Sequence, residues 1–411
     1  MSELKKYKLG DLGFFFGGVT SIKPEDYGFG TPFLPYKNVY KNSKVNVNEL
    51  ELMNVRPLDL DRRSAIYGDI FFTASSETPD EVAMSSVLLD NVENLTFNGF
   101  CKRFRLNNFN TLLPEYARYL FRDVSFRREV YQLATGDIRF NISQESLANI
   151  EIEIPDIQTQ KEIAEILTTL DDKIELNLQM NQTLEAMAQA IFKDWFINFN
   201  FQDFDGELVN GLPKRWKYKT IGELGKVITG TTPSSKNPEL FGSEIPFVTP
   251  TDFKNFGKLI LDASRYLSLE GKQSMKTRLL PSNSVIVTCI GSDMGKVAIN
   301  RIECVTNQQI NSIIPNRKLI SSDYLYYDLV YKYDYLRNIA TGGSTMLIIN
   351  KSRFEEIEIL VPNEDILLNF QNLMDNFNNR IEENVRQINS LTQTRDTLLP
   401  KLMSGKIEVI L

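Results

Sequence analysis

The segment Ile150-Glu151-Ile152-Glu153-Ile154-Pro155 recurs as Ile357-Glu358-Ile359-Leu360-Val361-Pro362, and a long heptad-patterned segment follows each copy. The apolar residues of each copy predict a short strand, and the proline prevents that strand from continuing. A residue type that caps helices comes next, Asp156 in the first copy and Asn363 in the second. The sequence therefore predicts the same transition, from strand to long helix, at two places.

Three further segments recur in the same order. Leu9-Gly10-Asp11-Leu12-Gly13 returns as Ile221-Gly222-Glu223-Leu224-Gly225, Pro32-Phe33-Leu34 as Pro246-Phe247-Val248, and Ala134-Thr135-Gly136 as Ala340-Thr341-Gly342. Because the matches keep their order roughly 210 residues apart, they indicate a tandem pair of domains rather than a solenoid. We predict an α+β fold with strand-rich domains at 1–155 and 201–362, each followed by a long helical spacer, at 156–200 and 363–411.

Both helical segments carry apolar residues at heptad spacing. Stripes of this length predict that the two helices pair as a coiled coil, although core helices of one globular domain are the alternative. Asn177 and Asn384 occupy the same repeat position, so we expect them to be matched and to set the register. The a and d positions are Ile163, Leu167, Leu170, Ile174, Asn177, Asn181, Leu184, Ala188, Ile191 and Trp195, then Phe370, Met374, Phe377, Ile381, Asn384, Ile388, Leu391, Arg395, Leu398 and Leu402.

The connection from 198 to 213 is short, which favours antiparallel pairing of the helices around a pseudo-twofold axis. A helix of about 40 residues is about 60 Å long, so such a pair would set the spacing of the two domains. Residues 156–206 carry three basic and ten acidic residues, a net charge of −7, whereas residues 207–362 carry 20 basic and 15 acidic, a net of +5. The acidic helix suits a protein partner better than a phosphate backbone.

The composition of the 411 residues excludes several classes of chemistry. The chain has no His, which excludes a Ser-His-Asp triad and any His-containing metal site. The three cysteines, Cys101, Cys289 and Cys304, are too few and too scattered for a disulfide framework or a Cys-only zinc site, so no metal site is expected. Without a signal-peptide core or a run of 18 apolar residues, the sequence predicts a cytoplasmic protein that spans no membrane.

No segment of the sequence that we considered matches the full pattern of a catalytic motif. The segment 291–296 resembles a phosphate loop, but its glycines are one residue too close and Val297 replaces the required Ser or Thr. We predict instead a hairpin turn whose return strand is 297–299. The Asn/Asp-Pro-Pro-aromatic tetrapeptide of amino-methyltransferases is absent from the sequence. The acidic pairs Asp171-Asp172 and Glu382-Glu383 diverge on a helix, so we expect solvated faces there and not metal ligands.

What remains is chemistry suited to binding nucleic acid. Arg118, Arg122, Arg127 and Arg128 surround a Tyr- and Phe-rich helix, and Lys254, Lys258, Lys272, Lys276, Arg278 and Lys296 lie in the second repeat. Arg and Lys serve phosphates and guanine edges, and Asn and Gln suit adenine edges, although a solvated surface is the competing interpretation for each residue. For the Asn307-Gln308-Gln309 run, hydrogen bonding inside the fold competes. The candidate DNA-binding residues are Lys37, Arg127, Arg128, Thr135, Gly136, Arg139, Thr251, Lys254, Ser292, Lys296, Gln308, Thr341, Gly342, Gly343, Ser344 and Thr345.

A further set of motifs follows in fixed order through the second half: Leu212-Pro213 with Trp216, then 221–224, 245–248, 289–299, 307–311 and 340–351. In this order and with the duplication, the whole chain resembles the specificity subunit of Type I restriction–modification systems, which serve host defence. The first half departs from the pattern, because Tyr7 stands where Trp is usual and Ser75-Ser76-Glu77 stands opposite 291–296.

The resemblance implies a subunit without catalytic residues. Each strand-rich domain would be a target recognition domain that reads one half of a split, asymmetric site in double-stranded DNA. The helical spacers would dock two methylation subunits, and restriction subunits would join through the complex. S-adenosylmethionine, ATP and Mg²⁺ would belong to those partners, so no cofactor is expected on this chain. The alternatives are a self-contained methyltransferase or nuclease with fused recognition domains, and a structural coiled-coil scaffold.

Overall fold

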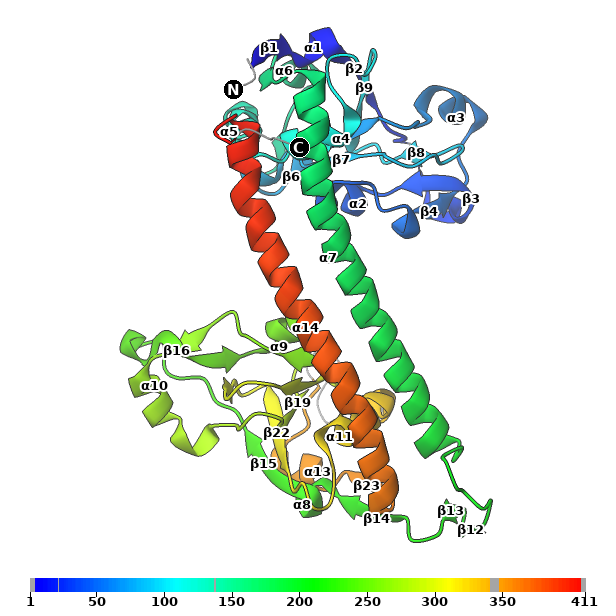
Figure 1. Cartoon of the computed structure of the whole chain (residues 1–411), viewed down its shortest axis with the longest axis vertical. Helices are drawn as coiled ribbons and strands as arrows, with labels where there is room; N and C mark the ends of the chain where they lie inside the picture. Colours follow the sequence, from blue (N-terminus) through cyan, green and yellow to red (C-terminus); the bar gives the residue numbers. More distant parts are fainter. Residues whose placement is uncertain (1–3, 21, 137, 341–346, 408–411) are drawn as a thin grey trace. The chain divides into compact units, whose positions relative to one another are not determined.

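The computed structural model describes residues 4–20, 22–136, 138–340 and 347–407, which form two compact units (Figure 1). The first unit comprises Met1–Glu175 and Ile388–Leu411, and the second comprises Leu176–Gln387. Each unit therefore contains one strand-rich region and segments of both long helices, α7 (Ile157–Phe192) and α14 (Glu364–Met403). The predicted α+β class, with a long helix after each strand-rich region, is confirmed.

The first unit contains a four-stranded sheet of order β2-β9-β5-β7 and a three-stranded sheet of order β4-β3-β8. Two further pairs, β1 with β11 and β6 with β10, complete its strands. The strands are β1 (Lys5–Lys8), β2 (Gly13–Gly17), β3 (Tyr27–Leu34), β4 (Glu51–Met53), β5 (Ile70–Thr73), β6 (Ser75–Ser76), β7 (Ser85–Val87), β8 (Thr96–Phe97), β9 (Cys101–Leu106), β10 (Phe140–Asn141) and β11 (Glu151–Ile154). The helices are α1 (Leu9–Leu12), α2 (Tyr36–Lys41), α3 (Pro57–Arg63), α4 (Pro114–Leu120), α5 (Val124–Leu133) and α6 (Gln144–Ala148).

The second unit contains a five-stranded sheet of order β15-β22-β19-β20-β17 and a three-stranded sheet of order β18-β16-β21, with the pairs β14–β23 and β12–β13. The strands are β12 (Leu208–Val209), β13 (Leu212–Pro213), β14 (Lys217–Thr220), β15 (Gly225–Thr229), β16 (Phe241–Val248), β17 (Leu259–Ile260), β18 (Tyr266–Leu267), β19 (Val285–Thr288), β20 (Val297–Asn300), β21 (Val305–Thr306), β22 (Ile310–Pro315) and β23 (Glu358–Val361). The helices are α8 (Ile221–Leu224), α9 (Pro250–Phe256), α10 (Leu269–Ser274), α11 (Ser322–Tyr331), α12 (Tyr333–Ile339) and α13 (Lys351–Glu355).

The sequence repeat is also a repeat of topology. The order β2-β9-β5-β7 of the first unit matches β15-β22-β19-β20 of the second, and β4-β3-β8 matches β18-β16-β21. In both units the strand before the long helix returns to pair with the strand that precedes the first short helix of its region, with Lys5 opposite Ile154 and Lys217 opposite Val361. The predicted hairpin is confirmed, since β19 and β20 pair antiparallel on either side of 289–296.

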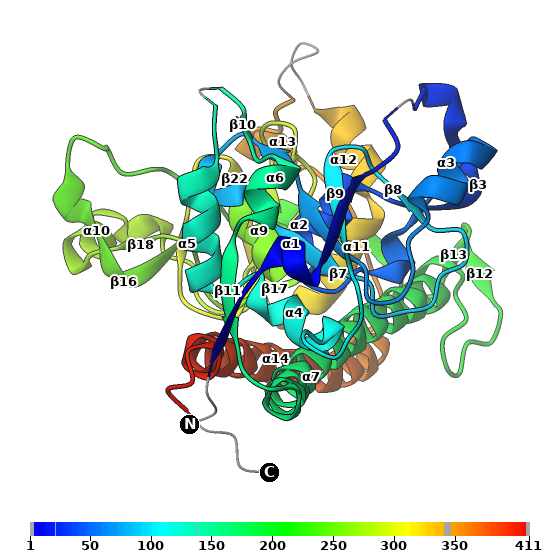
Figure 2. The same cartoon turned by 90° about the horizontal axis from the view of Figure 1, so that it is seen from above.

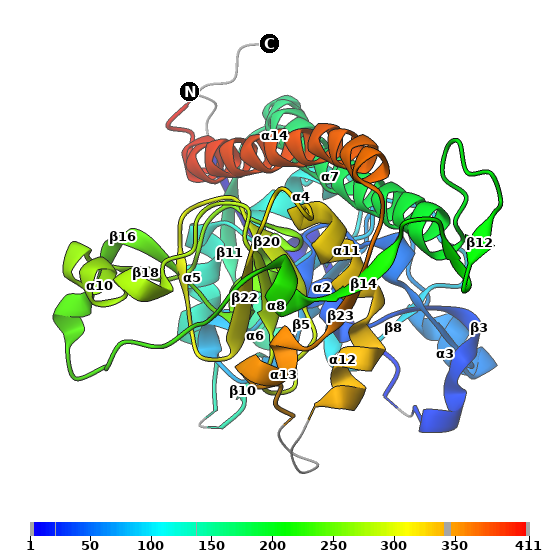
Figure 3. The ribbon, with the colours of Figure 1, turned by 90° about the horizontal axis from the view of Figure 1, so that it is seen from below.

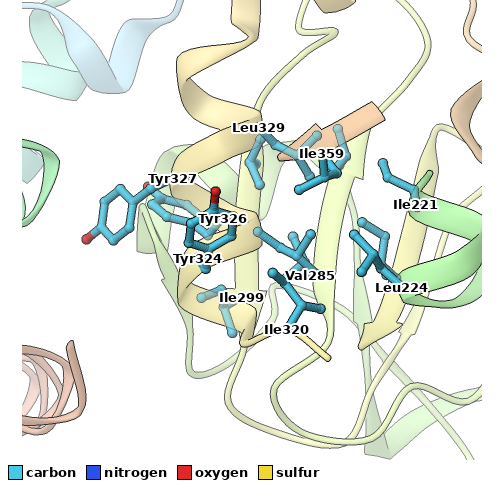
Figure 4. Close-up of a cluster of buried hydrophobic side chains, with 14 of the residues drawn as sticks. Ile221, Leu224, Val285, Ile299, Ile320, Tyr324, Tyr326, Tyr327, Leu329 and Ile359 are labelled. Carbon is cyan, nitrogen blue, oxygen red and sulfur yellow. The ribbon is translucent and has the colours of Figure 1, made fainter. Parts of the chain in front are cut away.

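The core of the second unit forms where α11 lies against its sheet (Figure 4). The rings of Tyr324 and Tyr327 are fully buried, and the aliphatic side chains around them come from α8, β19, β20 and β23. Phe370 of α14 belongs to the same cluster, together with Phe192 of α7. Burial of an aromatic side chain of this kind contributes roughly 1.5–3 kcal/mol, so these tyrosines anchor the strand-rich region to both helices.

In the first unit, α4 lies beside segments of both long helices (Figure 2), and a buried ion cluster joins the three. Asp171 of α7 accepts hydrogen bonds from Arg118 Nη2 at 2.7 Å, from the Tyr119 hydroxyl at 2.8 Å and from Arg395 Nη1 at 2.8 Å. The side chains of Arg118 and Asp171 are only 10% and 11% exposed. The expectation of a solvated face at Asp171 is therefore wrong, because arginines from two other helices enclose the carboxylate.

In the second unit, the equivalent helix α11 lies beside α14 (Figure 3), and it supplies an acid instead of a base. Asp323 lies 2.8 Å from Lys258 Nζ, and its carboxylate accepts hydrogen bonds from Asn378 Nδ2 at 2.9 Å and Gln371 Nε2 at 3.1 Å, both on α14. Lys258 also donates to the Tyr327 hydroxyl at 2.8 Å. The expectation that Lys258 contacts nucleic acid is wrong, because its side chain is 5% exposed and paired inside the fold.

The polar residues of the helix stripes pair differently from the prediction. Asn384 donates to Asn181 Oδ1 at 2.8 Å, and Asn177 donates to Gln387 Oε1 at 3.2 Å. The expected match of Asn177 with Asn384 is therefore wrong, because each amide reaches a residue about one turn away from its repeat counterpart. Glu382 is not on a solvated face either, since it forms an ion pair with Arg301 at 2.7 Å.

Candidate nucleic-acid interface

The two units place equivalent segments beside the equivalent sheets. α2 follows β3 in the first unit, and α9 follows β16 in the second. The connection from β5 to β7 corresponds to the connection from β19 to β20, because these strands hold the same places in their sheets. Tyr40 is the fifth residue of α2, and Lys254 is the fifth residue of α9. Each of these side chains contacts an acidic residue of the neighbouring connection, and the two contacts differ in chemistry.

In the first unit, the acidic residue is Glu81, which lies in the 3₁₀ turn Pro79–Glu81. The Tyr40 hydroxyl donates to Glu81 Oε1 at 2.6 Å, and Ser76 Oγ donates to Oε2 at 2.9 Å. These two hydrogen bonds lower the pKa of Glu81. The bond between Tyr40 and Glu81 also raises the pKa of Tyr40. The pair borders a cleft of about 310 Å³ lined by Tyr36, Tyr40, Ser75, Ser76, Glu77, Glu81, Phe100 and Arg139.

In the second unit, the acidic residue is Asp293, which is held between two lysines. Lys296 Nζ lies 2.6 Å from Asp293 Oδ1, and Lys254 Nζ lies 3.2 Å from Oδ2. Hydrogen bonds from the two lysines lower the pKa of Asp293. The backbone around it is a tight loop, because Gly291 and Gly295 adopt φ values of 92° and 91° that favour glycine. This position of the second unit is thus rich in donors, whereas its counterpart in the first unit holds an unneutralised acceptor.

Arg122 and Arg127, which the sequence suggested for nucleic acid, support the segments on either side of the cleft of the first unit. Arg122 donates to the carbonyls of Val39, Tyr40 and Asn42 at 3.0–3.1 Å and so supports α2. Burial lowers the pKa of Arg122 to about 10. Arg127 donates to the carbonyls of Asp80 and Val82, both at 2.6 Å, on either side of Glu81. Arg122 and Arg118 are therefore neither solvated nor free for a ligand, which corrects both interpretations of them.

The remaining predicted residues fall into three groups. Lys37, Arg128, Thr135, Gly136 and Arg139 are exposed in the first unit, as are Thr251, Lys254, Ser292 and Gln308 in the second. Gln308 accepts a hydrogen bond from Thr232 Oγ1 at 2.5 Å, and Asn307 donates to Gln309 at 3.0 Å, so this run bonds within the fold. Thr341, Gly342, Gly343, Ser344 and Thr345 lie outside the described residues. The role of all these residues in DNA binding stays a prediction.

Sequence reasoning missed Tyr40 and Glu81. They lie 41 residues apart, and neither belongs to a recognisable motif. Within the described ranges, no group of three or more His, Cys, Asp or Glu residues is placed to hold a metal ion. In the same part of the chain, no helix combines the length and apolar character needed to cross a membrane.

Comparisons with known proteins, by family, by sequence and by structure, agree with one another. The sequence matches the family described as Type I restriction modification DNA specificity domain over residues 1–186 and 213–393. It is 29% identical to the Type I restriction enzyme HindI specificity subunit of Haemophilus influenzae, over 99% of this chain and 100% of that one. It is 27% identical to the MjaIX specificity subunit of Methanocaldococcus jannaschii, over 72% and 70% of the two chains. The crystal structure of a Type I S subunit from M. genitalium has the same fold, with a TM-score of 0.63, 15% identity and coverage of 98% and 96%.

Proposed function

This chain belongs to the Type I restriction modification DNA specificity family and is a non-catalytic DNA specificity subunit, and from that premise we propose that its two strand-rich regions read the two halves of a bipartite, asymmetric site. The observation that carries the proposal is the repeated topology with different side chains at equivalent places, Tyr40 with Glu81 against Lys254 with Asp293. Two regions that share a topology but carry different side chains at equivalent positions suit two half-sites of different sequence. Membership in this family sets aside the alternative of a self-contained methyltransferase or nuclease.

The helices supply the other half of the proposal. The segment 156–206, with its net charge of −7, would dock methylation subunits, since a surface of that charge repels phosphates. Two similar helical repeats would offer two similar docking surfaces, hence two methylation subunits for each specificity subunit. Restriction subunits would join through that complex. S-adenosylmethionine, ATP and Mg²⁺ would be bound by these partners, and this chain would contribute the choice of sequence.

The direct test is to exchange residues 1–155 for the equivalent block of a relative with a different target. Methylome sequencing of a host that expresses the complete system then reports the methylated sequence. We expect one half of the recognised sequence to change and the other half to stay the same, because each unit has its own core. A change in both halves together would contradict the assignment of one reader to each half-site.

Lys296 provides a test of single-residue chemistry in the second unit. Its side chain is 37% exposed and paired with Asp293, so its charge is available to a phosphate only in competition with that pair. We expect Lys296→Ala to weaken binding of the assembled complex evenly across DNA sequences and to lower the salt slope by about one unit. Fluorescence anisotropy over a salt series measures both quantities.

The matched control is Lys214→Ala, which removes an exposed lysine paired with Glu207 in the β12–β13 hairpin of the same unit. It should leave the salt slope as it is in the wild type. If both variants lower the slope equally, the effect is one of overall charge. If neither does, Lys296 makes no phosphate contact.

A further inference from the structure

We propose that Glu81 is a specificity-determining residue of the first recognition region, where its carboxylate accepts a hydrogen bond from an exocyclic amino group in the DNA major groove. The amino group would be N4 of cytosine or N6 of adenine, the two base donors that the major groove presents. The inference rests on the proposed function, because it takes the cleft beside α2 as a surface that meets DNA. It goes further by naming the residue, the atom and the class of base group.

The geometry of the carboxylate suits an acceptor of this kind. Each oxygen of Glu81 already receives one hydroxyl, from Tyr40 and from Ser76, which fixes the orientation of the carboxylate. A carboxylate has about four lone-pair sites, so each oxygen keeps capacity for another donor. Among the described residues, no Lys or Arg forms an ion pair with Glu81. The hydroxyls lower the pKa of Glu81, so that near neutral pH it is ionised and can only accept.

An ionised acid on a DNA-facing surface weakens non-specific binding, because it repels the phosphates. Such a residue improves discrimination where a base donor meets it, since every other base leaves the charge facing an acceptor. The protein also fixes this acid firmly. Arg127 donates to the carbonyls before and after Glu81, and Arg122 supports the helix that carries Tyr40. A fixed acceptor between two supported segments is the arrangement that direct base readout requires.

The second unit supplies the contrast. At the equivalent place Asp293 is neutralised by Lys254 and Lys296, so this site presents donors and little free acceptor capacity. Donors of this kind match guanine O6 and N7 or a phosphate and do not match an amino group. The same position of the shared topology therefore has opposite hydrogen-bonding character in the two units. We infer that it is a position at which the two regions differ in the bases they select.

The experiment is Glu81→Gln in the complete system, which keeps the shape of the side chain and removes its charge. One base pair of the half-site read by the first region should become degenerate, and the other half-site should be unchanged. Competition binding with duplexes varied one base pair at a time should show discrimination at that pair falling at least about fivefold, the lower end for a base contact. Methylome sequencing gives the same answer in the host.

Glu93→Gln is the matched control, because Glu93 is an exposed carboxylate of the same unit that does not line the cleft. It removes the same charge as Glu81→Gln and should leave the sequence recognised unchanged. Tyr40→Phe is the second variant. It frees one carboxylate oxygen from its hydroxyl and should relax the same base pair to a smaller extent.

The outcomes separate the inference from the proposed function. If the wild-type complex shows no bipartite preference, the proposed function fails. If the wild type reads a bipartite site but Glu81→Gln and Tyr40→Phe keep full discrimination at every base pair, only the present inference is overturned. If Glu81→Gln fails to assemble with its partners, Tyr40→Phe decides between the two outcomes, because that variant leaves the charge in place.

Discussion

Lys258→Met is expected to lower the stability of the second unit by about 3–5 kcal/mol, because breaking a buried ion pair from one side leaves the other charge uncompensated. The Asp323 side chain is 2% exposed, and Lys258 is its only cationic partner among the described residues. Both tryptophans of the chain, Trp195 and Trp216, pack in this unit, so urea unfolding followed by tryptophan fluorescence reports its stability directly. A loss below about 1 kcal/mol, the range of an exposed pair, would contradict the prediction.

The control is Lys272→Met, because Lys272 forms an ion pair with Glu303 in which both side chains are more than one-third exposed. Its effect should stay within about 1 kcal/mol. The comparison separates burial of the pair from the loss of a lysine as such.

The pH dependence of the Lys258→Met deficit gives a second check. Burial raises the pKa of Asp323, but the charge of Lys258 and hydrogen bonds from Asn378 and Gln371 outweigh it, so the pKa lies below its ordinary value. In the wild type the pair therefore stabilises the fold above the unfolded-state pKa of about 3.9 and is lost as the pH falls through the folded-state pKa. Without Lys258, burial should raise the pKa of Asp323, so the deficit of the variant should be largest near neutral pH and shrink in acid.

Asp171→Ala is expected to have an effect of similar size in the first unit. It would leave Arg118 buried without a counter-charge and release Arg395 and the Tyr119 hydroxyl, so we expect a loss of about 3–5 kcal/mol. The tryptophans do not report on this unit. Hydrogen exchange of the α4 amides, measured by mass spectrometry, should show local protection falling by a corresponding amount.

The control for this variant is the next residue. Asp172→Ala removes an exposed carboxylate from the same turn of α7 and should leave α4 protection unchanged. Equal loss of protection in the two variants would mean that charge on the helix, and not the ion cluster at Asp171, stabilises α4.

The features that could be predicted from the sequence are those that depend on the spacing of residues close together in the chain. The Ile150–Pro155 segment and its copy at 357–362 each predict a strand that ends at a proline before a helix. The heptad stripes predict two long amphipathic helices. The hairpin at 291–296 follows from two apolar runs on either side of glycines. In each case neighbouring residues alone determine the outcome, because strand and helix periodicities are short.

The side-chain pairs that join segments far apart in the sequence, in the fold and in the candidate site, could not be predicted in this way. Arg118 meets Asp171 across 53 residues, and Tyr40 meets Glu81 across 41. An arginine offers the same five donors to a phosphate, a carboxylate or a backbone carbonyl, so its residue type does not reveal which of them it meets. The predicted match of Asn177 with Asn384 was wrong for a related reason. The heptad positions of Asn177 and Asn384 were right, but the partner that each amide reaches depends on how far one helix slides along the other.

The opposite polarity of the two ion clusters limits how such genes can be reshuffled. Asp171 and Asn378 lie 207 residues apart, the same offset as the two copies of the strand before each helix, yet one receives an arginine and the other an aspartate. Recombination that replaces a recognition region with another from the same position keeps these partners. Transposition of the second region onto the first helix would bring Asp323 against Asp171, so that two carboxylates would share the charges of Lys258, which moves with Asp323, and of Arg395. Recognition regions should therefore be exchanged more readily within one position of the gene than between the two positions.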